Sequence, residues 1–249
     1  MTRSLRFALF APLTLAIAAC NSGTGEGDAA SLEGEAIAAV EAPEGTEWRE
    51  MASATEDGGI LVGNPDAPLK LIEYASLTCP TCARFSQEGA EPLLDEYVNS
   101  GRVSFELRHF VIGGPLDLML GQLAKCNSVE SAVPLADQVW GNFQEVMNAT
   151  RGNAQAFEQA MSLPEDQRFV AAAERTGMLD FFAQRGLSAD RARECLANVE
   201  AFNDAAAMSQ RYANEFNIGG TPTFVLNGNE LDVNLWQDLE PLLKRAGAR

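Results

Sequence analysis

Two cysteines separated by two residues, Cys79 and Cys82, limit the fold of this chain more than any other feature. They follow a β-rich run at residues 69–74 and precede an amphipathic stretch at residues 83–97. Such a strand-to-helix junction places the first sulfur beside unpaired N–H groups, where the helix dipole favours a thiolate. Pro80 suits the first helical position, because its missing N–H would have no partner there. The motif therefore predicts thiol–disulfide exchange, with Cys79 as the attacking thiol and Cys82 as the resolving thiol.

Two other interpretations fit a cysteine pair at this spacing. It is also typical of half a structural zinc site, which needs four ligands, and of an inert structural disulfide. The other cysteines, Cys20, Cys126 and Cys195, are isolated, and His109 is the single histidine, which we expect to take part in packing. No loop typical of a metal, a phosphate or another cofactor is visible. We therefore expect neither a metal nor a cofactor, while both alternatives stay open on the spacing alone.

A second pattern, about 140 residues further on, reads Gly-Gly-Thr-Pro at residues 219–222. A short strand at 223–226 follows, and then Asn227-Gly228, a pair typical of a type I′ hairpin turn before a returning strand. A proline that opens a strand after two glycines is compatible with a cis peptide bond. Taken alone, the pattern favours the alternative, an ordinary edge-strand proline.

Together the two motifs resemble the thioredoxin superfamily, and the long helical stretch between them resembles its DsbA-like branch of bacterial periplasmic oxidoreductases. The resemblance covers about residues 59–246. It implies that Cys79 is the nucleophile, that Cys82 is the resolving thiol, and that Pro222 is a cis-proline packed opposite the disulfide. It also implies that Thr221 offers backbone hydrogen bonds to an extended substrate.

Glu73, six residues before Cys79, matches the buried acid with which this family takes up the proton of Cys82. Without the resemblance, the alternative that stays open is a surface carboxylate at a strand edge. The dipeptide Pro80-Thr81 departs from the most oxidising members, which have a histidine there. A missing positive charge means a less stabilised thiolate and a less oxidising disulfide, so the direction of electron transfer stays open.

The first residues are typical of a secretory signal. Arg3 and Arg6 precede an apolar run at residues 7–19, which is too short to span a bilayer. We expect a signal peptide at 1–19. Its end resembles the bacterial lipobox, which implies that Cys20 is lipidated and anchors a periplasmic lipoprotein. The alternative is ordinary cleavage that leaves Cys20 as a thiol.

Residues 20–57 are rich in small and acidic residues, with Arg49 as the single basic one. Low hydrophobicity with one-sided charge predicts a flexible tether. The net charge of −17 argues against nucleic-acid binding. We expect membrane contact through the lipid anchor and nowhere else.

The order of elements past the tether predicts an α/β thioredoxin fold with an inserted all-helical subdomain. We assign residues 58–112 and 217–249 to the thioredoxin-fold domain and residues 113–216 to the insertion. The pattern predicts strands at 69–74 and 103–110, a strand hairpin at 223–233, and helices at 80–98 and 235–244, with Pro92 bending the first helix.

Cys126 and Cys195 both lie on apolar stripes of the helical section. They are either buried free thiols or a pair, and leftover cysteines in a secreted chain usually pair. We expect a structural disulfide without a catalytic role.

These features predict a thiol–disulfide oxidase that acts on secreted or periplasmic proteins through Cys79 and Cys82, together with a membrane redox partner. A periplasmic reductase is the alternative within the same chemistry. A third hypothesis is a thioredoxin-like module that binds copper(I) through the two thiols. The methionines of the chain, however, are scattered and form no ligand cluster.

Overall fold

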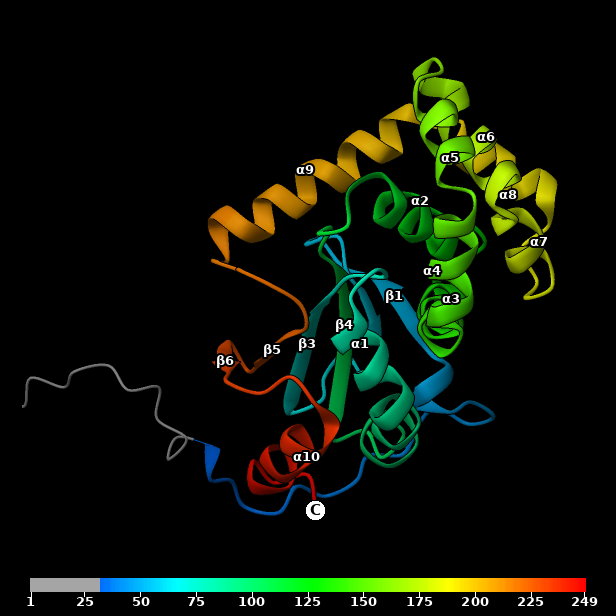
Figure 1. Ribbon diagram of the computed structural model, residues 1–249. Helices are drawn as coiled ribbons and strands as arrows, with labels where there is room; N and C mark the ends of the chain where they lie inside the picture. The colour runs from blue at the N-terminus through cyan, green and yellow to red at the C-terminus, as the bar shows by residue number, and fades with distance from the viewer. Residues whose placement is uncertain (1–31) are drawn as a thin grey trace, which may run out of the picture. The chain divides into compact units, whose positions relative to one another are not determined.

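A six-stranded sheet runs through residues 32–249, the part of the chain that the computed structural model describes. The predicted signal peptide and Cys20 lie outside the described residues. The strands stand in the order β1-β2-β4-β3-β5-β6, with β3 and β4 parallel and the other neighbours antiparallel (Figure 1). Their bounds are β1 Ala52–Ala54, β2 Ile60–Val62, β3 Leu69–Ala75, β4 Val103–His109, β5 Thr223–Leu226 and β6 Asn229–Leu231.

The centre of the sheet was predicted from the sequence, and its β1–β2 edge was not. The two central strands, β3 and β4, are buried along most of their length and start at the predicted residues. Asn227 and Gly228 both have positive φ, as the predicted hairpin turn between β5 and β6 requires. By contrast, β1 and β2 are three residues each, too short to show a period of two.

Ten α-helices accompany this sheet in the described part of the chain. They are α1 Pro80–Phe85, α2 Gly114–Lys125, α3 Val129–Gly141, α4 Phe143–Gly152, α5 Ala154–Met161, α6 Glu165–Thr176, α7 Met178–Ala183, α8 Ala189–Leu196, α9 Val199–Glu215 and α10 Trp236–Arg245. None of the helices within residues 32–249 is long and apolar enough to cross a bilayer. The helices α2 to α9 stand between β4 and β5 in the chain, so the predicted fold class with its helical insertion is confirmed.

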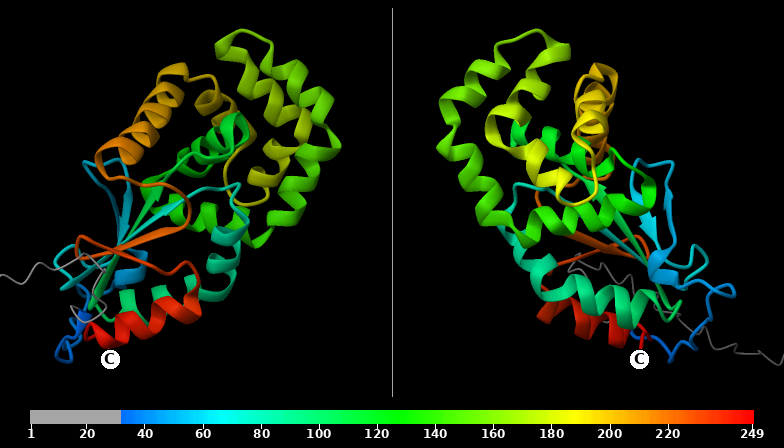
Figure 2. Two further views of the ribbon diagram at one scale, coloured as in Figure 1. Left: turned by 60° about the vertical axis from the view of Figure 1, so that its left-hand side comes forward. Right: turned by 90° about the vertical axis from the view of Figure 1, so that its right-hand side faces the viewer.

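The two faces of the sheet have different covers. On one face, Phe85 of α1 packs on Phe224 of β5 with ring centroids 4.6 Å apart, and Trp236 of α10 lies 6.4 Å from Phe85. In both views of Figure 2, α10 runs beside the helical segment that begins with α1. On the other face, Tyr74 of β3 meets Tyr212 of α9 at 5.1 Å. The alternation of β3 therefore sends Glu73 and Tyr74 to opposite sides.

The helix predicted at 80–98 is not one regular helix. After α1 the chain forms two wider, π-helical segments, η3 (Ser86–Ala90) and η4 (Leu93–Val98), on either side of Pro92. In the second, the N–H of Asn99 donates to the carbonyl of Leu94, five residues earlier, at 2.9 Å. A proline has no N–H and crowds the preceding turn, so wider turns near it accommodate the ring.

The prediction of a flexible tether is wrong for residues 32–57. Trp48 is 8% exposed, and its indole N–H donates to the carbonyl of Val40 at 2.8 Å. The N–H groups of Gly34 and Ile37 donate to carbonyls near the C-terminus, each at 2.9 Å, and the segment includes β1. Average composition missed this arrangement, because a few well-placed apolar residues and backbone hydrogen bonds hold an otherwise acidic segment.

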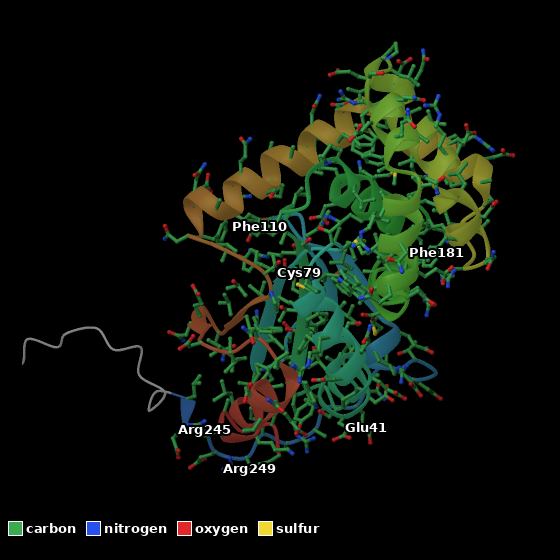
Figure 3. All side chains as sticks on the ribbon, in the orientation of Figure 1. Glu41, Cys79, Phe110, Phe181, Arg245 and Arg249 are labelled. Atoms are coloured by element: carbon green, nitrogen blue, oxygen red, sulfur yellow. A yellow bond between two sulfur atoms is a disulfide. The ribbon has the colours of Figure 1, made fainter. Side chains whose placement is uncertain are left out.

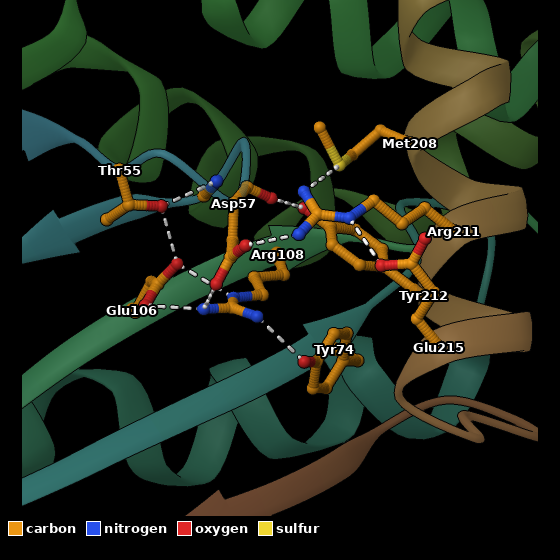
Figure 4. A network of polar contacts seen from close by, with 10 residues as sticks. Thr55, Asp57, Tyr74, Glu106, Arg108, Met208, Arg211, Tyr212 and Glu215 are labelled. Carbon is orange, nitrogen blue, oxygen red and sulfur yellow. Dashed lines mark hydrogen bonds and ion pairs between the residues drawn. The ribbon is translucent and has the colours of Figure 1, made fainter.

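A buried ion network ties this segment to the sheet (Figure 4). Arg108 of β4 is 4% exposed. Its guanidinium donates to Glu106 at 2.7 Å, to the Tyr74 hydroxyl at 2.9 Å and to Asp57 at 3.0 Å. The Thr55 hydroxyl donates to the same Glu106 carboxylate at 2.7 Å. All of these groups lie on or beside the sheet face that α9 covers.

The network continues into α9. Arg211 donates to the second carboxylate oxygen of Asp57 at 2.9 Å, and the Tyr212 hydroxyl donates to the carbonyl of Asp57 at 2.5 Å. Asp57 therefore joins the N-terminal segment both to β4 and to the helix that returns from the insertion. This joint fixes the end of α9 from which the chain enters the loop before β5.

Replacing Arg108 with methionine should lower the free energy of unfolding by about 3–5 kcal/mol, because it leaves a buried carboxylate without its cation. Chemical denaturation measures this loss. Arg193→Met is the matched control: Arg193 also binds two carboxylates, Glu174 and Asp190, but at the surface, so its replacement should leave the free energy of unfolding nearly unchanged. Equal losses in the two variants would contradict the structural role of the network.

Cys126 and Cys195 form the disulfide that the sequence predicted. It joins the C-terminal end of α2 to α8, with Cα atoms 5.9 Å apart and a sequence separation of 69. The bond closes a long loop within the inserted helices. Its expected contribution is to restrict the unfolded chain.

Replacing Cys126 and Cys195 together with alanine should lower the free energy of unfolding by about 4 kcal/mol, the loop-closure value for this separation. The rate at which Cys79 reacts with a small disulfide should not change, because neither residue belongs to that site. Reduction of this bond in the wild type should cause the same loss of stability. That result would show that the loss comes from the missing bond and not from the replacement of the cysteine side chains. A double variant as stable as the wild type would refute this role.

Candidate active site

Cys79 is the N-cap residue of α1, as the motif predicted (Figure 3). The backbone N–H of Cys82 donates to the sulfur of Cys79 at 3.4 Å. Both thiols are free; Cys79 is 4% exposed and Cys82 fully buried. Pro80 stands at the first helical position and is exposed, and Thr81 is half-buried. The first sulfur thus lies where α1 leaves its N–H groups unpaired.

The loop before β5 packs against Cys79. The Thr221–Pro222 peptide bond is cis, one of the two possibilities that the sequence left open, and Pro222 is buried. The Cys79 thiol donates to the carbonyl of Thr221 at 3.2 Å. The two motifs, about 140 residues apart in the chain, therefore meet at one sulfur atom.

The two thiols have opposite acidities. The hydrogen bond from Cys82 lowers the pKa of Cys79 to about 5; burial opposes this, while the Thr221 side chain and two backbone N–H groups support it. Burial, with the hydrogen bond to Cys79 and the charge of Glu73, raises the pKa of Cys82 far above that of an ordinary thiol. At neutral pH the pair therefore consists of one thiolate and one thiol, the arrangement that favours attack by the first sulfur.

Glu73 is a buried acid beneath the pair and not a strand-edge carboxylate. It is 2% exposed on the central strand β3, and its Oε1 has no hydrogen-bond partner. Burial, and after it the charges of Asp137 and Cys79, raise its pKa well above the ordinary value. A carboxyl in this position holds a proton under conditions where a surface glutamate is ionised.

Asp117 of α2 anchors the loop that leads to Cys79, and sequence reasoning missed it. It is fully buried and accepts hydrogen bonds from Ser76 Oγ (2.6 Å), Leu77 N (3.0 Å), Ile112 N (2.9 Å), Gly113 N (3.1 Å) and His109 Nε2 (2.9 Å). Burial disfavours its charge, but His109 and the hydrogen bonds outweigh burial and lower the pKa to about 2. In the sequence it looks like any acidic residue in the first turn of a helix.

Two further contacts hold the same loop. The Trp140 indole of α3 donates to the carbonyl of Ser76 at 3.0 Å. Gly113 packs so closely against Thr78 that a Cβ there would lie 2.0 Å from the threonine hydroxyl oxygen. The residues just before Cys79 are therefore fixed by α2, α3 and the loop after β4. No cluster of three or more potential metal ligands occurs within residues 32–249.

A family model described as thioredoxin matches residues 55–245. The chain belongs to the thioredoxin family. The structure of this thioredoxin-family chain is also similar to a crystal structure of a protein-disulfide isomerase from Novosphingobium aromaticivorans. That similarity has a TM-score of 0.68 at 28% identity and covers 75% of this chain and 96% of that one.

Two further similarities agree with this family. Wolbachia pipientis α-DsbA1 has a TM-score of 0.60 at 19% identity, over 78% of this chain and 94% of that one, which shows a shared fold. A Rickettsia conorii protein assigned by inference as a protein-disulfide oxidoreductase is 23% identical over 176 residues, which are 70% of this chain and 54% of that protein. The chain spans about half the length of the curated relatives it matches. The predicted resemblance to the DsbA-like branch is confirmed for the fold.

Replacing Thr221 with valine should raise the pKa of Cys79 from about 5 by about one unit, because it removes a buried hydroxyl that has no hydrogen-bond partner among the described residues and that favours the thiolate. The rate of reaction with a disulfide reagent falls as the pH drops through this pKa, so the acid limb should move to higher pH. Thiolate absorbance against pH provides a direct titration.

Thr223→Val is the matched control for this prediction, because its hydroxyl donates to the carbonyl of Gly220 at 2.9 Å and not to Cys79. Its Cys79 pKa should remain near 5. An unchanged pKa in Thr221→Val, or the same shift in both variants, would show that the Thr221 side chain does not stabilise the thiolate.

Proposed function

We propose that this protein is a bacterial periplasmic thiol–disulfide oxidase of the DsbA-like type, which introduces disulfides into secreted proteins through Cys79 and Cys82. The observation that carries the proposal is the opposite acidity of the two thiols, beside the cis Thr221–Pro222 bond. A low pKa for Cys79 stabilises the reduced pair, and a stabilised reduced form makes the disulfide a stronger oxidant.

The proposed reaction begins with the Cys79–Cys82 disulfide. A client thiolate attacks the sulfur of Cys79, a mixed disulfide forms, and Cys82 leaves as a thiolate that takes up a proton. A second client thiolate then attacks the client sulfur and releases Cys79 as a thiolate. Two client thiols lose two electrons and become a disulfide, while the Cys79–Cys82 pair gains both electrons. Thr221 and Pro222 offer their backbone to an extended client segment during these steps.

The cellular setting is part of the proposal. The signal peptide at 1–19 and lipidation of Cys20 would place the protein on the periplasmic side of a membrane. A membrane redox partner would restore the disulfide after each turnover, because the oxidase cycle leaves the pair reduced. Clients are secreted or periplasmic proteins with free thiols.

A periplasmic reductase is the second candidate. It is favoured by one observation, the threonine at position 81, where the most oxidising relatives are expected to have a histidine. In this role the membrane partner would keep the Cys79–Cys82 pair reduced, and Cys79 would attack client disulfides. A copper(I) module has less support, because no third metal ligand joins the two thiols among residues 32–249.

The redox potential separates the two candidates. We expect a value between about −120 and −200 mV from equilibration of the Cys79–Cys82 pair with glutathione, whereas a reductase should lie near −270 mV, the approximate value for thioredoxin. The Cys126→Ala/Cys195→Ala variant is suited to the titration, since it leaves one disulfide to titrate. The oxidase should also speed the oxidative refolding of a reduced client. A potential near that of thioredoxin, with no such acceleration, would reject the oxidase in favour of the reductase.

A further inference from the structure

A narrow cavity lies behind the active-site helix, and two carboxyl groups line it. It has a volume of about 10 Å³, roughly the space that one water molecule needs. Glu73 lines it from β3, Asp137 from α3 and Ser86 from the first turn after α1. The rest of its wall is largely apolar. The insertion thus contributes an acid to the same enclosed space as the buried acid of the thioredoxin fold.

Asp137 is held in place by the active-site helix itself. The hydroxyl of Ser86, four residues after Cys82, donates to Asp137 Oδ1 at 2.8 Å. Burial raises the pKa of Asp137 to about 6, although the bond from Ser86 acts in the opposite direction. The charge of Asp137 in turn raises the pKa of Glu73. Two carboxyl groups that line one small cavity influence each other's protonation.

The cavity also adjoins solvent. Leu94 and Val133 line it and at the same time line an open surface hollow of about 400 Å³. Asp137 keeps part of its residue surface exposed, whereas Glu73 is buried. Of the two acids that line the cavity, Asp137 is therefore the one nearer to solvent.

The groups that can change the charge in this region are few. The thiols of Cys79 and Cys82 lie at the start of α1, and Asp117 of α2 is occupied by its own five donors. The other charged residues on the elements packed against α3 are exposed: Arg84, Glu88, Lys125, Glu145 and Arg151. On β4, the neighbour of β3, Glu106 and Arg108 lie with Tyr74 on the sheet face opposite Glu73. The pH response of Glu73 should therefore depend mainly on the two thiols and on Asp137.

We propose that Asp137, on the inserted helical subdomain, exchanges protons between Glu73 and solvent across this cavity and so controls the ionisation of Cys82. This inference rests on the proposed thiol–disulfide exchange. Asp137 acts through Glu73 and touches neither sulfur, so it is a positioning residue. The insertion would then take part in the chemistry of the thioredoxin fold as well as covering it.

The proton path can be written for the step that resolves a mixed disulfide. The Cys82 thiol gives its proton to the Glu73 carboxylate, and the Cys82 sulfur forms a bond with Cys79. The bond between Cys79 and the client sulfur breaks, and the client leaves as a thiolate with the electron pair. Glu73 passes the proton to the Asp137 carboxylate, and Asp137 releases it to solvent. In the oxidase direction the same proton moves inward, to the Cys82 thiolate.

The test compares two steps in one reaction. Reduced protein is mixed with oxidised glutathione, and acid quenching followed by mass spectrometry separates attack by Cys79 from resolution by Cys82. Asp137→Asn should leave the attack unchanged and slow the resolution by about tenfold at its maximum. In the Asp137→Asn variant, the acid limb of the pH profile of the resolution rate should move to lower pH by about one unit, because loss of the Asp137 charge lowers the pKa of Glu73.

Three variants make the result specific. Asp137→Glu keeps a carboxyl and should restore most of the resolution rate. Ser86→Ala removes the donor to Asp137 and should slow resolution to a smaller extent, which provides a test if Asp137→Asn folds poorly. Asp204→Asn, an exposed acid on α9, is the control and should match the wild type. Infrared titration of the protonated carboxyl band, assigned with Glu73→Gln, reports the Glu73 pKa independently of activity.

The outcomes distinguish the two proposals. If the wild type forms no mixed disulfide with glutathione, the proposed function fails. The second case is that the wild type forms and resolves the mixed disulfide. If Asp137→Asn then has the wild-type resolution rate and the wild-type Glu73 titration, the proposed thiol–disulfide exchange stands and the proton relay through Asp137 is refuted. Slowing of both steps together, with no shift in the infrared titration, would mean that Asp137 acts through packing alone and would also overturn the relay.

Discussion

The position of one sulfur atom, at the first turn of α1, is the constraint on which the rest of the site depends. A thiolate is stable there if the donors around it are fixed before the proton leaves. Three separate parts of the chain fix them: Asp117 of α2 and Trp140 of α3 hold the preceding loop, and Thr221 closes the site from the opposite side. Two of these three come from the inserted helices. The insertion therefore helps to hold the loop that carries Cys79.

Solvation separates the roles of the paired thiols and of the acids near them. Cys79 receives hydrogen bonds that favour its charge, whereas Cys82, three residues on, lies in surroundings where a charge is costly. The same contrast separates the acids. Asp117 is ionised although it is buried, because five donors surround it, while Glu73 is buried with an unpartnered oxygen and tends to hold its proton. Local hydrogen bonds, more than burial itself, decide which group carries charge here.

The sequence predicted those parts of the fold whose signals are local. The cysteine pair, the Gly-Gly-Thr-Pro run and the central strands each carry their physical cause within a few residues. The burial of Glu73 came from family resemblance and not from its neighbours. Asp117 and Asp137 escaped prediction, because their partners Ser76 and Ser86 lie 41 and 51 residues away along the chain. The prediction of a flexible tether was wrong for a different reason: the average composition of a segment says little about where a single tryptophan packs.

The ordered N-terminal segment limits how far the folded protein can extend from a lipid anchor. Because residues 32–57 lie against the fold, a lipid on Cys20 would leave about twelve residues between the membrane surface and the folded protein. A chain of that length extends at most about 40 Å. Such a short linker would keep the active site close to the bilayer surface. The effective concentration of the active site at membrane partners would therefore be high. Client proteins would then be met chiefly as they emerge from the membrane, before they diffuse away.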